Sequence, residues 1–309
     1  MNPTNIPPDG ARASLLDRTL DQAQPSEQDY LEVLDLTVDF DGFKAVDGVK
    51  LTVTPGDLRF LIGPNGAGKT TIIDALTGLV PAKGTAQFAG RDLLGLPPHR
   101  IVRLGVGRTF QTASVIEGLT TLQNLDVAAG LHRSAWSRFR RRRDVPEEVT
   151  EVLETIGLAD LADVPAGILA HGQKQWLEIG MLLVQRAQVL LLDEPVAGMS
   201  AAEREQTGQL LMRIGRKRVV VVVEHDMEFL RSFADSVTVL HQGKVLAEGG
   251  VAEVQANPAV IEVYLGAPAP AAAEQAGTTS AAKATPAARV AKPASAALPT
   301  QAKPAGREG

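Results

Sequence analysis

Apolar and polar residues alternate in two stretches near the start of the chain. The first runs from Leu31 to Phe40 and the second from Val49 to Val53. A repeat of two residues places every second side chain on the same face of a strand, so that one face can be buried while the other meets water. The two stretches therefore predict strands of a small antiparallel sheet.

Three short runs further along the chain are wholly apolar, namely Phe60 to Ile62, Val189 to Leu192 and Val219 to Val223. Strands of a parallel sheet that is covered by helices on both faces have this composition, because neither face meets water. Ligands of such sheets bind beyond the carboxyl ends of the strands. The runs predict an α/β fold whose chemistry lies at one edge of its sheet.

Helical spacing of apolar residues appears between these runs. Thr71 to Leu76 has a helical pattern, and the region 112–166 is helix-like, most clearly between Val145 and Leu158. A further apolar stripe covers residues 176–184. We expect Trp176, which lies on this stripe, to belong to the core rather than to a ligand site.

Composition divides the chain into three parts. The 309 residues are 44% hydrophobic, which allows one large α/β domain with a subdomain. We place that domain at 30–266, with a helical subdomain at about 112–187. Residues 1–29 are expected to form a flexible arm. The Ala/Pro-rich tail 267–309 has too few large apolar side chains to offset chain entropy and is expected to be disordered.

Charge and residue types exclude several functions. A net charge of −5 gives no sign of nucleic-acid binding, and the absence of cysteine excludes disulfides and thiol chemistry. No run of eighteen apolar residues and no export signal is present, so attachment to a membrane would come through a partner. The basic run 138–143 is open to two interpretations, a solvated surface or a contact with anionic lipid.

The segment after the first apolar run is rich in glycine and precedes a helical pattern. Such a loop turns successive backbone N–H groups toward phosphate oxygens at the start of a helix. Lys69 can then reach the β- and γ-phosphates of ATP, and Thr70 can ligate Mg²⁺. The residues expected to bind the nucleotide here are Gly63, Pro64, Asn65, Gly66, Ala67, Gly68, Lys69, Thr70 and Thr71.

Asp193 and Glu194 directly follow the second apolar run. We expect Asp193 to hold Mg²⁺ through its water shell and Glu194 to orient and polarise the water that attacks the γ-phosphate. The alternative is that Asp193 caps the next segment and Glu194 is only solvated. An Asp-Glu-Pro exit from a strand, beside a phosphate loop, favours the metal and water roles.

The turn Leu169-Ala170-His171-Gly172-Gln173 opens a helix between the phosphate loop and the Asp-Glu pair. A Leu-x-x-Gly-Gln turn in this position resembles the signature of ATP-binding cassette (ABC) proteins, and the resemblance extends from about residue 31 to residue 266. It implies a P-loop ABC nucleotide-binding domain, α/β with a RecA-like core, an antiparallel β subdomain and a helical subdomain. It also implies an ATPase that works in pairs, in which residues 169–173 of one chain contact the nucleotide of the other.

The same resemblance assigns roles to other residues. Gln111 matches the loop glutamine that senses Mg²⁺ and the γ-phosphate, and His225 matches the switch histidine that hydrogen-bonds the γ-phosphate. Phe40 stands where the family has an aromatic residue that stacks on adenine, although Phe43 is a rival and either could belong to the core. The catalytic residues implied are Glu194, His225, Gln111 and Lys69, and the metal-binding residues implied are Thr70, Gln111 and Asp193.

Two departures from the family pattern change the expectation. Ala170 replaces a serine that donates to the γ-phosphate, so the contact is left to the backbone N–H groups of Gly172 and Gln173. A charge-assisted hydrogen bond contributes about 1.5–3 kcal/mol, so we expect a weaker nucleotide sandwich. The segment 197–200 also lacks the aspartate with which the family often ends the loop after its Asp-Glu pair.

Residues 171–181 and 194–199 resemble the ATPase subunits of urea ABC importers. Importers of branched-chain amino acids are the alternative, and a soluble ABC ATPase without a transport role is a rival of another class. The resemblance implies an identical or sibling ATPase subunit as partner, two membrane permease subunits, and indirectly a solute-binding protein, with no nucleic acid. It places the chain at the cytoplasmic face of the cell membrane.

Overall fold

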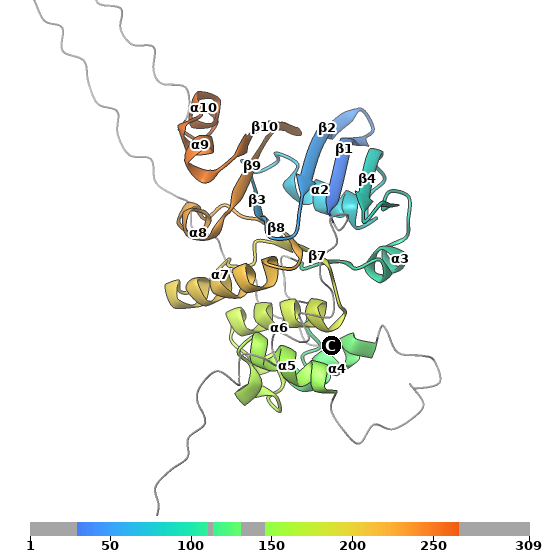
Figure 1. Cartoon of the computed structure of the whole chain (residues 1–309), viewed down its shortest axis with the longest axis vertical. Coiled ribbons are helices and arrows are strands. Elements are labelled where there is room, and N and C mark those ends of the chain that lie inside the picture. The colour runs from blue at the N-terminus through green and yellow to red at the C-terminus, as the bar shows by residue number, and fades with distance from the viewer. Residues whose placement is uncertain (1–29, 111–113, 131–145, 266–309) are drawn as a thin grey trace, which may run out of the picture. The chain divides into compact units, whose positions relative to one another are not determined.

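Figure 1 shows a computed structural model of the chain, which describes residues 30–110, 114–130 and 146–265. Four predicted features lie outside the described residues: the arm 1–29, Gln111, the basic run 138–143 and the tail 267–309.

A six-stranded sheet forms the centre of the described chain. Its strands are β3 (Leu58–Ile62), β6 (Val106–Arg108), β7 (Val189–Asp193), β8 (Val219–Val223), β9 (Ser236–His241) and β10 (Lys244–Gly249). Their order is β10-β9-β3-β8-β7-β6, with β10 antiparallel to β9 and all other neighbours parallel. Strands β3, β7 and β8 are buried along their whole length. The three apolar runs are thus confirmed as parallel strands.

A four-stranded antiparallel sheet is formed by strands on either side of β3 in the chain. Its strands are β1 (Leu31–Phe40), β2 (Phe43–Val53), β4 (Lys83–Phe88) and β5 (Arg91–Asp92), in the order β2-β1-β4-β5. The predicted alternation in β1 is interrupted once, because the register shifts between Val33 and Leu36 and Asp35 adopts a φ of 51°. This bulge leaves Leu34 exposed, although its apolar side chain suggested the buried face.

Helices cover both faces of the six-stranded sheet. They are α2 (Lys69–Leu76), α3 (Pro98–Arg103), α4 (Thr121–Ala129), α5 (Glu147–Thr155), α6 (His171–Val184), α7 (Ala201–Gly215), α8 (Met227–Phe233), α9 (Val251–Ala256) and α10 (Pro258–Leu265). Helix α2 packs between the two sheets in one apolar cluster, and α4 to α8 pack on the opposite face in another. In Figure 1, α4, α5 and α6 lie together, as the helix-like pattern predicted.

Successive residues of the central strands point into different clusters. Leu190 and Leu192 face the helices α4 to α8, whereas Val189 and Leu191 face α2. This two-sided burial is the physical reason why the strands are wholly apolar. Because β3, β7 and β8 are parallel, their carboxyl ends meet at one edge of the sheet.

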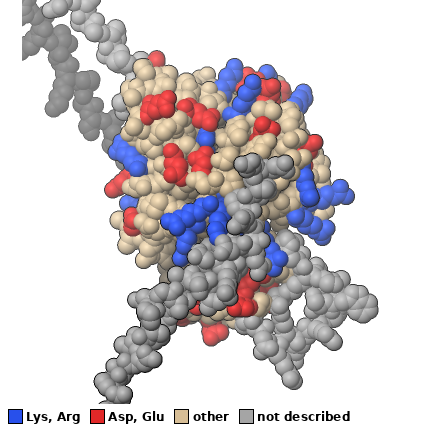
Figure 2. All heavy atoms as spheres, viewed as in Figure 1, with Lys and Arg blue, Asp and Glu red and all other residues tan. Residues whose placement is uncertain are grey.

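The surface of the described residues carries both signs of charge. Acidic and basic side chains both appear on the face shown in Figure 2. None of the helices in the described ranges is long and apolar enough to cross a membrane.

Candidate functional site

The glycine-rich loop connects β3 to α2, and close backbone contacts explain two of its glycines. At Gly63, φ is 155° and an added Cβ atom would lie 2.3 Å from the carbonyl oxygen of Leu240. At Gly68, φ is 103° and a Cβ atom would lie 2.5 Å from the carbonyl oxygen of Ala45. A side chain has no room at either position. The loop can therefore wrap tightly into the start of a helix, an arrangement that binds anions.

Lys69 begins α2, and its side chain folds over this loop. Its Nζ donates hydrogen bonds to the carbonyl oxygens of Gly63, at 2.7 Å, and Pro64, at 3.2 Å. Burial lowers the pKa of Lys69, and the nearby carboxylates of Glu194 and Asp193 partly offset this effect. The ammonium group thus lies where it can meet an anion that the loop binds.

Asp193 ends β7 and is buried. Its backbone N–H donates to Thr109 Oγ1 at 3.2 Å, and its side chain is hydrogen-bonded with that of Thr70. Burial raises the pKa of the Asp193 carboxyl, against the opposing effect of the Arg108 charge. A hydroxyl and a carboxylate in contact are the hard oxygen ligands that Mg²⁺ takes together with phosphate and water. These two residues fit a magnesium site.

Glu194 follows Asp193 in an unusual backbone conformation. Its φ is 50°, in the left-handed region, and its N–H donates to the carbonyl oxygen of Val223 in β8 at 2.9 Å. Its Oε1 lies 3.5 Å from Nδ1 of His225, which is the second residue after β8. Because β3, β8 and β7 are adjacent parallel strands, the structure brings Glu194 and His225 to the same edge as the phosphate loop.

The predicted turn 169–173 makes contacts within itself and with the segment that follows Glu194. Gln173 folds back, and its Oε1 accepts the backbone N–H of Ala170 at 3.0 Å. His171 Nε2 lies 3.1 Å from the carbonyl oxygen of Ala197, in the segment that follows Glu194. The turn is therefore tied to that segment of its own chain.

Ser200 supplies a different interaction from the aspartate that the family often has there. Its hydroxyl accepts the backbone N–H of Glu203, and Glu203 Oε2 accepts the N–H of Ser200 at 2.8 Å. This reciprocal pair is a capping box, which satisfies two backbone donors at the start of α7. The departure at this position thus has a structural role.

The two aromatic candidates lie opposite one another in the hairpin between β1 and β2. Phe40 is 45% exposed and Phe43 is 68% exposed, and the two are cross-strand partners. The alternative that either belongs to the core is wrong. Trp176 is half-buried against the core, and its Nε1 donates to Thr207 Oγ1 at 2.8 Å.

Two buried glutamates near these residues were not predicted from the sequence. Glu178 Oε1 accepts the backbone N–H groups of Phe110 and Ser114, each at 3.3 Å, and these residues flank the segment that contains Gln111. Glu224 directly follows β8, immediately before His225, and is 1% exposed. Glu178 interrupts an apolar helical stripe, and Glu224 directly follows an apolar strand. A buried carboxyl group requires hydrogen-bond partners, so these positions were the available signal.

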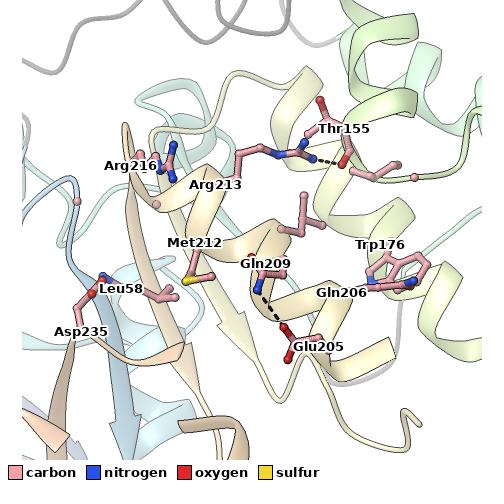
Figure 3. A pocket seen from close by; sticks show the side chains of 15 residues that line it. Leu58, Thr155, Trp176, Glu205, Gln206, Gln209, Met212, Arg213, Arg216 and Asp235 are labelled. Atoms are coloured by element: carbon pink, nitrogen blue, oxygen red, sulfur yellow. Dashed lines mark hydrogen bonds between the residues drawn. The ribbon is translucent and has the colours of Figure 1, made fainter. Parts of the chain in front are cut away.

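One hollow in the described part of the chain lies away from the phosphate loop. A groove of about 860 Å³ is lined by α5, α6 and α7 and by Leu58, which begins β3, whereas the loop follows the other end of that strand. Arg213 of α7 donates to the carbonyl oxygen of Thr155 across it (Figure 3). A smaller hollow of about 260 Å³ is lined by residues that include Phe110 and Glu178.

Comparison with protein families gives two matches. Residues 46–197 match the family described as ABC transporter, and residues 244–270 match the one described as Branched-chain amino acid ATP-binding cassette transporter. The first match contains the phosphate loop, the turn 169–173 and the Asp-Glu pair. The second covers β10, α9 and α10.

Individual relatives agree with these matches. The chain is 39% identical to the high-affinity branched-chain amino acid transport ATP-binding protein BraF of Pseudomonas aeruginosa, over 76% of this chain and 97% of that protein. It is 36% identical to LivG of Escherichia coli, a protein of the same description, over 77% and 98%. A crystal structure of the ADP conformation of an ATP-binding cassette of an ABC transporter superposes with a TM-score of 0.67, at 30% identity over 77% and 98% of the two chains.

Proposed function

We propose a function on the premise that this chain belongs to the ABC transporter family, as an ATP-binding subunit of the branched-chain amino acid transporter branch. It binds ATP and is an ATPase. We infer that it powers the import of a solute across the cell membrane. The observation that carries this proposal is the meeting of Lys69, Asp193, Glu194 and His225 beside the phosphate loop.

The residues at this edge divide the work of hydrolysis. The loop 63–71 holds the phosphates of ATP, and Lys69 neutralises charge on the β- and γ-phosphates. Thr70 and Asp193, together with Gln111, hold Mg²⁺, which supplies further charge neutralisation when it is bound. Phe40 stacks on adenine at the rim.

The bond-breaking step depends on Glu194 and His225. The carboxylate of Glu194 orients a water molecule, whose oxygen attacks the γ-phosphorus in line with the bond to ADP. His225 donates a hydrogen bond to the γ-phosphate and keeps it in register. The products are ADP and inorganic phosphate, and the Glu194 carboxylate accepts the proton that the water loses.

A pair of chains completes each site. We propose that residues 169–173 of one chain close over the nucleotide of a second ATPase subunit, identical or a sibling. Two membrane permease subunits receive the resulting motion and hold the pair at the cytoplasmic face of the membrane. A solute-binding protein delivers the cargo. The exposure of Ala170 and His171 at the start of α6 supports this proposal, whereas Leu169 and Gly172 of the same turn are buried within the single chain.

We propose a branched-chain amino acid as the solute. The named relatives support this choice at 39% and 36% identity, over nearly their whole lengths. Urea is a second candidate, and the resemblance of residues 171–181 and 194–199 to urea importers favours it.

Uptake in cells tests the proposal. A strain that lacks this chain is compared with the same strain carrying the wild-type chain or Glu194→Gln, using labelled leucine and labelled urea at low concentration. We expect leucine uptake to be lost without the chain and restored only by the wild type. Loss of urea uptake alone would replace the amino acid with urea, and loss of neither would overturn the transport function.

A further inference from the structure

Glu224 is a buried carboxylate at the end of β8 with three backbone donors around it. Its Oε1 accepts the N–H of Val196 at 3.2 Å. Its Oε2 accepts the N–H of His225 at 3.1 Å and that of Asp226 at 3.5 Å. The side chain thus connects the segment after β7 to the segment after β8.

Both segments carry a residue of the proposed reaction. Val196 is two residues after Glu194, and the N–H of Glu194 itself donates to β8 at Val223. His225 directly follows Glu224, and its Nδ1 lies 3.5 Å from Glu194 Oε1 and 4.0 Å from Glu224 Oε2. Glu224 therefore closes a small ring of contacts that contains both Glu194 and His225.

The far side of this ring is anchored in two helices. Asp226 Oδ1 accepts the N–H groups of Glu228 and Phe229 at the start of α8, each at 3.0 Å. Its Oδ2 accepts a hydrogen bond from Nη1 of Arg204 in α7 at 2.9 Å. Because these bonds hold Asp226 in place, a shift of the Glu224 carboxylate would displace Glu194 and His225 rather than Asp226.

We propose that Glu224 is a positioning residue for ATP hydrolysis, whose buried carboxylate fixes the separation of Glu194 and His225. This inference rests on the proposed roles of those two residues. Glu224 touches neither nucleotide nor water in the proposed reaction and acts through the backbone. A displacement of reacting groups by about 1 Å can lower a rate about 100-fold. The three hydrogen bonds that Glu224 accepts, which we call the Glu224 bracket, should therefore affect turnover strongly.

A carboxylate is required because all three neighbours are donors. Both oxygens of an ionised carboxylate accept hydrogen bonds, whereas an amide has one accepting oxygen and one donating NH₂ group. Burial raises the pKa of Glu224, and the N–H groups of Val196, His225 and Asp226 oppose that shift by stabilising the charged form. Glutamine at this position can satisfy one side of the bracket but presents a donor to the other.

The test is Glu224→Gln in the full-length protein, with steady-state ATP hydrolysis, equilibrium ATP binding and thermal unfolding measured together. We expect kcat to fall roughly 10- to 100-fold, with KM and ATP affinity within about twofold of wild type. A residue with a merely structural role would not separate turnover from binding in this way. Glu224→Asp, which keeps the charge but is too short to span both segments, serves if the glutamine variant does not fold, with the same expectation.

Asp235→Asn is the matched control. Asp235 Oδ2 also accepts one backbone N–H, that of Leu58 at 2.9 Å, but at the opposite end of the strands, and one amide oxygen suffices to keep that bond. We expect its kcat to equal that of wild type.

Three outcomes would contradict the inference, and they separate the positioning role from the catalytic function on which it rests. Wild-type turnover in Glu224→Gln, or a parallel loss of turnover and ATP affinity, overturns the positioning role if Glu194→Gln is inactive. Normal turnover in Glu194→Gln instead overturns the proposed catalytic function, and the inference with it.

Discussion

Glu194 combines a functional side chain with a costly backbone conformation. A non-glycine residue with positive φ costs of order 1–3 kcal/mol and persists only where its surroundings fix it. Here the carbonyl oxygen of Val223 and the bracket at Glu224 do so. In this conformation the Glu194 carboxylate lies 3.5 Å from Nδ1 of His225.

Replacing Glu194 by glutamine tests its role directly. Glutamine keeps the size of the side chain but loses the charge that polarises water. We expect ATP hydrolysis to fall about 10²- to 10⁴-fold while ATP binding and the melting temperature stay near those of wild type. Phosphate release and binding of a fluorescent ATP analogue measure the two quantities, and normal turnover would show that another group activates the water.

Ala170→Ser has two separable consequences. Ala170 precedes α6 with an extended backbone and offers no side-chain cap, so a serine hydroxyl should stabilise the helix by about 1 kcal/mol. The same hydroxyl can still donate to a γ-phosphate, since it has one donor and two acceptor positions. We therefore expect a higher melting temperature without nucleotide and an ATP-driven dimer tighter by about 1.5–3 kcal/mol. Sedimentation with ATP checks the second effect, which fails if the dimer affinity is unchanged.

At the scale of elements, the packing of α7 on α8 depends on one glycine. An added Cβ atom at Gly208 would lie 2.3 Å from the ring of Phe233, which also packs in a tilted arrangement against Phe229, at 5.0 Å between ring centroids. The ring is 7% exposed and lies against Phe229, so moving it would disturb that contact. Close approach of the two helices is thus built into the sequence at this position.

Gly208→Ala should therefore destabilise the fold. Overpacking a core typically costs about 1–3 kcal/mol, and we expect a loss of stability of that size in urea unfolding. Gly215→Ala, near the end of the same helix, is the control because its nearest neighbour, Val220, would be 3.9 Å away. That variant should be neutral or slightly more stable, by up to about 1 kcal/mol. Equal effects of the two substitutions would contradict the packing argument.

Elements with strong local patterns were predictable, whereas pairings between distant segments were not. The strands at 189–192 and 219–223 follow from their apolar composition, and the phosphate loop follows from its glycines. The bulge at Asp35 depends on the register of β1 with β2 and β4, which no local pattern encodes. Strand β10 was missed although it pairs with the adjacent strand β9 through the turn at Gln242 and Gly243. The hydrogen bond between Val196 and Glu224 was not predicted because these residues are 28 positions apart in the sequence.

For the molecule as a whole, Glu178 links stability to pH. It is 4% exposed, and burial raises its pKa from 4.5 to about 7, despite the backbone N–H groups of Phe110 and Ser114. The unfolded chain releases this proton near pH 4.5, but the folded chain retains it until about pH 7. Since the folded state binds more protons between these values, stability falls as pH rises through this window.

Glu178→Gln should remove this dependence. The difference between 4.5 and about 7 corresponds to about 3 kcal/mol, so the variant should be similar to wild type near pH 4.5 and more stable by up to that amount above pH 7. Urea unfolding from pH 5 to 8 measures the difference. Glu262→Gln, at an exposed position of α10, should show no such trend. A constant difference across the pH range would exclude Glu178 as the source.

The contact between His171 and the carbonyl oxygen of Ala197 has a consequence for a pair of chains. It joins the turn that would close over a partner's nucleotide to the segment that leaves the chain's own Asp193 and Glu194. We therefore expect movement at either place to be transmitted to the other within one chain. In the proposed dimer this makes the two ATP sites cooperative, so that hydrolysis should rise more steeply with ATP concentration than two independent sites allow.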